Sequence, residues 1–179
     1  MSSGLQAQFG VVAETTYGTA VTVNRFYPLV NESMTQEIAR LESAGIIAGA
    51  RVLRSEQWDP GDITVGGDIG LELYQQHTGL LFEHMLGSIT SSATGGVATH
   101  TVTPGSLSGK SLTVQIGKPD TGGTVRPFTY TGMKVASWEV AVQAGEIVTL
   151  GLTTLAQAET TGIALATASF GTNAGAPFT

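Results

Sequence analysis

A strict alternation of apolar and polar residues is the feature of this 179-residue sequence that most constrains its fold. Side chains of a β-strand point alternately to the two faces of a sheet, whereas a helix repeats every 3.6 residues. In segment 63–74 the apolar side chains share one face of an extended chain: Ile63, Val65, Ile69, Leu71 and Leu73. The other face carries glycines, a threonine, Asp68 and Glu72. The segment is therefore predicted to be a half-buried strand with a small, acidic second face.

Two further segments alternate in the same way. In segment 134–143, Trp138, Val140 and Val142 are expected to point inward, and Glu139 outward with Ser137 and Gln143. In segment 147–155 the inward residues are expected to be Val148, Leu150 and Leu152. Only Ala144-Gly145-Glu146 separates the two runs, which predicts a hairpin with a tight turn around Ala144-Gly145.

Weaker alternation predicts strands over 27–41, 98–103, 111–117 and 125–130. Segment 75–86 breaks the period, because its apolar residues recur at helical spacing: Leu81, Phe82, Met85 and Leu86. Gly87 supplies a C-terminal stop, so a single short helix is expected, packed on the outside of the sheet. The fold class is therefore mainly β with one flanking helix.

Composition narrows the function classes. Lys and Arg number 8 against 14 Asp and Glu, which gives a net charge of −6 and argues against a nucleic-acid binder. Only 12 % of residues are charged, so much of the surface is expected to be buried in an assembly. The absence of cysteine excludes disulfides, Cys-based zinc sites and thiol catalysis.

The sequence contains no spacing typical of a phosphate-binding, metal-binding or acid–base catalytic site. Segment 105–111 contains a Gly-Lys pair, but its spacer is too short for a phosphate-binding loop and a strand follows it. His77 and His84 lie seven residues apart, about 10 Å along a helix, which is too far to hold one metal ion. The Cα atoms of Asp68 and Glu72 are about 13 Å apart along a strand, too far for an acid–base pair. We therefore expect no enzyme activity, no cofactor and no metal.

The N-terminal third carries a family resemblance. Residues 9–33, and above all the segment Glu14-Thr-Thr-Tyr-Gly-Thr-Ala20, resemble the opening of phage tail tube proteins, the major tail proteins of long non-contractile tails. Two strands, a long loop, an acid-dotted strand and a helix ending at Leu86-Gly87 then follow in the order typical of that family. The resemblance covers about residues 5–155.

The resemblance implies a β-sandwich or half-open barrel with one flanking helix. It further implies hexameric rings, with the inner sheets joined into one barrel and the rings stacked into a tube through which the genome passes without specific binding. The implied partners are further copies of the chain and other tail proteins (tape measure, terminator and tail tip), with no membrane. The implied location is the virion tail, assembled in the host cytoplasm.

Two domain-level and site-level expectations follow. Residues 1–159 are expected to form the tail-tube-like domain, and 160–179 either an Ala/Gly/Thr-rich tail or the start of a further segment. Asp68, Glu72 and Glu139 are expected to line the lumen, because each lies on the small, polar face of a strand. An acidic lining repels DNA and keeps the passage slippery.

Segment 45–62 has no clean period and is predicted to be a long loop that packs against a neighbouring subunit. Exposed apolar residues in such a loop favour a partner, and Trp and Arg are common interface anchors. We expect Trp58 with Arg51 or Arg54 to form the anchor, and Glu56 and Asp59 to be its ion partners. The alternative is an ordered loop folded over its own sheet, with Trp58 as a local lid.

Two other functions remain open at this point. One is a tail terminator or tail-tip ring protein with a related fold. The other is a free-standing β-sandwich binding module, which would favour a secretion signal and a platform of exposed aromatic residues. Imaging of the purified chain separates the three, because they give tubes, isolated rings and monomers respectively.

Overall fold

Two crossed layers of β-sheet share one long strand. The computed structural model describes residues 6–49, 52, 54–75, 77–94, 97–170 and 177–179. Its elements, in chain order, are β1 (Gln8–Ala13), β2 (Arg25–Tyr27), β3 (Leu29–Glu32), β4 (Thr35–Glu42), the 3₁₀ turn η2 (Ser55–Gln57), β5 (Trp58–Glu72), α1 (Gly79–Leu86), β6 (Gly87–Thr94), β7 (Val97–Pro104), β8 (Leu112–Pro119), β9 (Val125–Ala141), β10 (Thr149–Ala156) and β11 (Ala158–Thr160).

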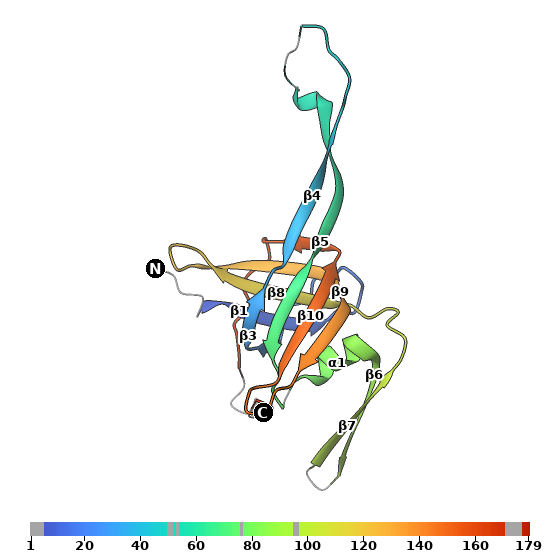
Figure 1. Ribbon diagram of the computed structural model, residues 1–179, viewed down its shortest axis with the longest axis vertical. Helices are drawn as coiled ribbons and strands as arrows, with labels where there is room; N and C mark the ends of the chain where they lie inside the picture. The colour runs from blue at the N-terminus through green and yellow to red at the C-terminus, as the bar shows by residue number, and fades with distance from the viewer. Residues whose placement is uncertain (1–5, 50–51, 53, 76, 95–96, 171–176) are drawn as a thin grey trace.

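The main sheet has the strand order β2-β1-β8-β9-β10-β5-β3, with β4 also paired to β5 and β11 to β9. Strand β9 joins the two layers: residues 125–133 pair with β8, and residues 134–141 pair with β10. Figure 1 shows β4, β5 and β10 running along the long axis of the molecule, while β1 and β8 run across it. The result is the mainly β, half-open barrel that the sequence predicts.

The core lies between the two layers and is closed on one side by α1. Alternation places its residues, because every second side chain of β1, β8, β5 and β10 points inward. The largest fully buried side chains include Phe9, Ile69, Leu71, Leu112, Ile116, Tyr130, Met133, Leu150 and Leu152. The inward face predicted for segment 147–155 is confirmed, and so is that of 63–74 from Val65 onward.

Several predicted boundaries are wrong. Strand β5 begins at Trp58, so the last part of the predicted 45–62 loop is a strand, and Ile63 is 57 % exposed rather than inward. The predicted strand 27–41 is divided into β2, β3 and β4. The two runs predicted at 125–130 and 134–143 form one continuous strand, β9.

The burial predicted for Trp138 and Val142 is also wrong: Trp138 lies opposite buried Leu152, on the core-facing side, but is 43 % exposed, and Val142 is 71 % exposed. Residues 134–141 of β9 lie at the border of the sheet, and Val142 lies in the connection to β10 beyond the core. A register shift at Thr153/Thr154 further separates the end of this strand pair from the regular ladder. Alternation therefore continues past the point where there is a core to bury it.

Helix α1 begins at Gly79, four residues later than predicted, and ends at Gly87, which adopts the left-handed conformation with φ 107°. Its buried residues are Leu80, Leu81, His84 and Met85, while Phe82 and Leu86 are half-buried against the core. His84 Nδ1 lies 2.9 Å from the carbonyl oxygen of Leu80. Burial lowers the pKa of His84. Within the described ranges, no helix is both long enough and apolar enough to cross a membrane.

A buried carboxylate ties the first loop to both layers. Glu14 Oε1 accepts hydrogen bonds from Gly132 N (2.7 Å) and Thr113 Oγ1 (3.0 Å). Its Oε2 accepts from Ser111 Oγ (2.7 Å) and Gly18 N (2.8 Å). Gly132 has φ 63°, a conformation that favours glycine, and it lies where β9 passes from one layer to the other.

The chain beyond β11 packs along the outside of the β1–β8 layer. The buried Gln115 side chain donates to Ala164 O (3.1 Å) and accepts from Ala166 N (2.8 Å). At the other end of the core, Phe178 N donates to Leu73 O (3.0 Å) and Val148 N donates to Phe178 O (2.8 Å).

Replacement of Leu81 by alanine should lower the free energy of unfolding by about 2–5 kcal/mol, because it opens a cavity under α1. Thermal melting followed by circular dichroism measures the change. The matched control is Val142→Ala, which removes an exposed side chain and should leave the melting temperature nearly unchanged. Equal melting temperatures for the two variants would contradict the packing described for α1.

The Glu14→Gln variant should be destabilised by about 3 kcal/mol, because an amide offers one acceptor oxygen to four donors and turns its own N–H groups towards them. Denaturant unfolding measures this loss. Glu37→Gln, which alters an exposed carboxylate, is the control and should unfold like the wild type. A Glu14→Gln midpoint equal to that of the control would show that the carboxylate is not structural.

Candidate functional site

One polar face runs across three adjacent strands, on the side of β5, β10 and β9 that points away from the core. The register places Thr153 between Asp68 and Ser137, and Gly151 between Gly70 and Glu139. Thr149 lies opposite Glu72 in the same row. Because paired residues of antiparallel strands share a face, the three carboxylates that the sequence singled out lie together on this surface.

The three carboxylates are held to different degrees. Asp68 Oδ1 accepts a hydrogen bond from Thr153 Oγ1 (2.8 Å), and the Asp68 backbone N–H donates to Ser33 Oγ (2.9 Å). Tyr74 Oη lies 3.4 Å from Glu72 Oε2, and burial and then the Glu72 charge raise the pKa of Tyr74. Asp68 and Glu139 are exposed, and Glu72 is half-buried. In the described part of the chain, none of the three forms an ion pair.

A shallow groove of about 530 Å³ crosses this face. Gly70 and Gly151 form its floor, and Asn31, Asp68 and Glu139 stand around it. The described residues contain no group of three or more side chains placed to hold a metal ion. The face therefore combines small residues with three carboxylates.

The sheet that carries this face is open at both sides. Within the described residues, the 134–141 part of β9 pairs only with β10, and β3 and β4 pair only with β5. Unpaired N–H and C=O groups along a strand are a template for pairing with another chain. The geometry therefore offers two complementary edges on one subunit.

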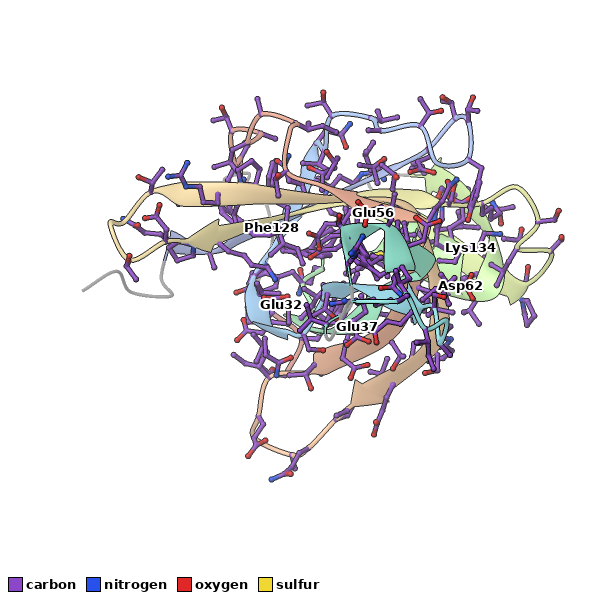
Figure 2. All side chains as sticks on the ribbon, turned by 90° about the horizontal axis from the view of Figure 1, so that it is seen from above. Glu32, Glu37, Glu56, Asp62, Phe128 and Lys134 are labelled. Carbon is purple, nitrogen blue, oxygen red and sulfur yellow. The ribbon has the colours of Figure 1, made fainter. Side chains whose placement is uncertain are left out.

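Strands β4 and β5 continue past the layers as a long hairpin (Figure 1). Arg54, Glu56, Trp58 and Asp59 lie in its distal part, and Arg51 lies outside the described residues. Figure 2 looks down the hairpin and shows Glu37, Glu56 and Asp62 around it. Because the hairpin extends away from the body, a loop folded over its own sheet does not describe this segment.

The tip of the hairpin is ordered by polar contacts rather than by an apolar core. The Gln57 side chain donates to Gly45 O (2.8 Å) and accepts from Arg54 N (3.1 Å). The Arg40 guanidinium lies 5.1 Å from the centre of the Trp58 ring and 2.9 Å from Glu42 Oε1. Ile46 and Val52 are 98 % and 77 % exposed, so the tip presents apolar side chains to its surroundings.

Sequence reasoning missed two parts of this arrangement. Strands β1 and β6 were not predicted, because β1 is short and β6 is rich in serine and threonine with little apolar alternation. The edge position of β9 was not predicted either, since alternation does not reveal how many neighbours a strand has. Arg40, which stacks on Trp58, lies in the predicted strand 27–41, and no function was predicted for it.

Comparison with known proteins gives one family and several distant structures. The family model described as phage tail tube protein matches residues 4–179. A comparison with curated protein sequences finds no match. Among solved structures, the chain is similar to the SPP1 tail tube, with 9 % identity over 85 % of this chain and 74 % of that one and a TM-score of 0.45.

Two further structures are similar at the same distance. For the virion of a native gene transfer agent particle, the identity is 11 % over 89 % of this chain and 97 % of that one, with a TM-score of 0.45. For the anti-feeding prophage baseplate, the identity is 11 % over 86 % of this chain and 90 % of that one, with a TM-score of 0.44.

Proposed function

This chain belongs to the phage tail tube protein family and is a structural protein of the tail tube, and we propose that its copies close into hexameric rings that stack around a lumen. The role is structural rather than enzymatic and uses no cofactor. The tube forms part of the virion tail, is assembled in the host cytoplasm with the tape measure, terminator and tail-tip proteins, and delivers the genome.

The observation that carries the ring proposal is the pair of open edges on one sheet. In the proposed ring, the 134–141 edge of β9 in one subunit pairs with the β3–β4 edge of the next. Repetition of this contact closes these sheets of six subunits into one barrel that has no open edge of its own. Exposed residues at the two edges, including Trp138 and Ile38, are then covered by the neighbour.

The polar face of β5, β10 and β9 then lines the lumen. Asp68, Glu72 and Glu139 lie on the side of the sheet opposite the core, so closure of the barrel with the core outside turns them inward. DNA carries one charge per about 1.7 Å of axis, and a basic wall would hold it by counterion release. A ring of carboxylates repels the DNA, while Gly70 and Gly151 keep the wall free of large side chains.

The lumen assignment predicts that Asp68→Lys combined with Glu72→Lys leaves tube assembly intact but slows genome ejection. Ejection from phages carrying the variant is measured by the release of DNA after receptor addition, and electron microscopy checks the tubes. The control is Asp68→Asn with Glu72→Gln, which removes the charge without reversing it and should give an intermediate rate. Ejection at the wild-type rate from the lysine variant would rule out the assignment.

The distal β4–β5 hairpin is proposed to contact a neighbouring subunit. Its tip carries exposed apolar residues that its own chain does not cover, and Trp58 is 46 % exposed beside Arg40. Trp and Arg are frequent anchors of interfaces because they combine a large contact area with forked hydrogen bonding. Arg51 or Arg54 is proposed to complete the anchor with Trp58, and Glu56 and Asp59 to pair with cations of the neighbour.

Removal of this contact should block polymerisation while the subunit stays folded. Trp58→Ala, and separately a replacement of residues 43–57 by a short Gly-Ser linker, are compared with the wild type by electron microscopy and circular dichroism. Truncation of an interface anchor costs about 2–4 kcal/mol, and a tube repeats that cost in every subunit. Tubes of normal length from the linker variant would refute the contact.

A terminator or tail-tip ring protein is the second candidate within the same fold. The two open sheet edges serve a single ring as well as a stack of rings. Imaging of the purified wild-type chain decides between them, because a tube protein forms extended tubes and a terminator stops at isolated rings. Monomers at all concentrations would contradict both.

A further inference from the structure

A second hairpin, formed by β6 and β7, projects from the end of the molecule opposite the β4–β5 tip (Figure 1). The two strands pair from Gly87↔Pro104 to Thr94↔Val97 and form a sheet of their own. Among the described residues, neither strand pairs with any other, so both edges are open. The base of the hairpin packs on α1, but its distal part extends away from the body, where a two-stranded sheet is marginally stable in water and would be stabilised by a further strand.

The base of this hairpin is fixed to the body, so the hairpin is presented in one direction. A Cβ added at Gly87 would collide with Gly105 O, so the start of β6 and the residue that follows β7 lie in close contact. Gly105 N donates to Leu86 O (2.7 Å) at the end of α1. The side chain of Ile89 packs on Gly79, where an added Cβ would lie 3.1 Å from Ile89 Cδ1. Beyond Ile89 the described side chains of β6 are exposed.

The edges of β6–β7 lack the usual protection against pairing. Proteins guard open edges with Lys or other charges, and residues 87–104 contain no Lys, Arg, Asp or Glu. The exposed described positions are serines, threonines and alanines, together with His100 and, at the base, Pro104, and none is a Lys, Arg, Asp or Glu that would repel an incoming strand. The hairpin therefore has the chemistry of a strand acceptor.

A polar pocket of about 430 Å³ lies at the base of the hairpin and carries a surplus of donors. Its lining includes Arg25, His77, Glu83 and His100. Glu83 is already paired with Lys110, whose Nζ lies 2.6 Å from Glu83 Oε1. Arg25 forms no ion pair within the described residues. The pocket is therefore suited to an acidic segment.

The β4–β5 hairpin has the complementary properties. In the part of the chain that the structure describes, Glu37, Glu56, Asp59 and Asp62 form no ion pair, and the outer edge of β4 is unpaired. Beyond the proposed ring contact at Ile38, the remaining edge of β4 from Ala39 to Glu42 spans about 10 Å at 3.3 Å per residue. It points away from the body at the end opposite β6–β7 (Figure 1).

We infer that the β6–β7 hairpin, with the pocket at its base, receives the distal β4–β5 hairpin of a second copy of this chain in the adjacent ring. This inference rests on the proposed stacking of rings and names the surface that accepts the hairpin. The donor and acceptor are different surfaces at opposite ends of one molecule. A head-to-tail contact of this kind does not close on itself and propagates a filament, as a tube requires.

The chain contains no cysteine, so an introduced pair reports this contact without background. Glu56→Cys at the tip of one hairpin is combined with Thr90→Cys near the base of the other, and assembled tubes are treated with a short bismaleimide. We expect a ladder of covalent multimers on a denaturing gel from tubes and none from monomers. The control pair, Glu56→Cys with Thr121→Cys in the β8–β9 turn, should give no ladder.

A change of charge on the acceptor hairpin tests the same contact independently. Thr101→Glu places an acid on the acceptor and should shorten tubes severalfold at low salt, with recovery at 0.5 M salt, where charges about 4 Å apart or more are screened. Thr101→Gln has nearly the same size and should give tubes of wild-type length. Equal tube lengths for the two variants would contradict the acidic partner.

The outcomes separate this inference from the proposed function. Wild-type tubes that form normally but give no ladder with Glu56→Cys and Thr90→Cys would overturn the inference and leave the tube function intact. A ladder of equal strength with the control pair would also overturn it, because the cross-link would then not be specific to the two hairpins. A wild-type chain that forms no tubes would contradict the proposed function itself.

Discussion

The four hydrogen bonds accepted by the Glu14 carboxylate hold the rest of the architecture in place. They connect the first loop, through Gly18, to the start of β8 and to Gly132 of β9. Gly132 lies where β9 leaves one layer and enters the other, so this carboxylate fixes the bend that creates the half-open barrel. The segment from Glu14 to Ala20 is also the part of the sequence that most closely resembles the tail tube family. Within that segment, Glu14 is thus the residue that sets the geometry of β9, the strand shared by the two layers.

The parts of the fold that the sequence predicts well are those with one buried face. Strand β10 and the second half of β5 alternate cleanly because a core lies on one side of them only. The distal β4–β5 hairpin and the outer part of β6 have no body beneath either face, so burial imposes no alternation on them. A strand with no buried face does not need alternating apolar and polar residues. For this reason residues 45–62 were predicted as a loop and β6 was missed.

The acidic face shows a similar division. Alternation alone placed Asp68, Glu72 and Glu139 on the polar sides of their own strands. Only the register of β10 between β5 and β9 shows that the three sides form one surface. Likewise, the sequence marks Trp58 as unusual, but the stacking of Arg40 on its ring depends on a cross-strand neighbour that pattern reading cannot assign. The face on which a side chain lies follows from its own strand, whereas its neighbours on other strands depend on the order and register of the sheet.

Strand β9 also has a mechanical meaning. A single backbone runs from the layer built on β1 and β8 to the outermost strand beside β10. Tension applied to residues 134–141 therefore reaches the other layer through covalent bonds, and the packed side chains between the layers do not have to slip. A wall made of such units resists shear between its inner and outer surfaces, and its compliance is concentrated at the non-covalent joints between one molecule and the next. When the assembled structure bends, the interfaces between subunits deform, while each subunit keeps its shape.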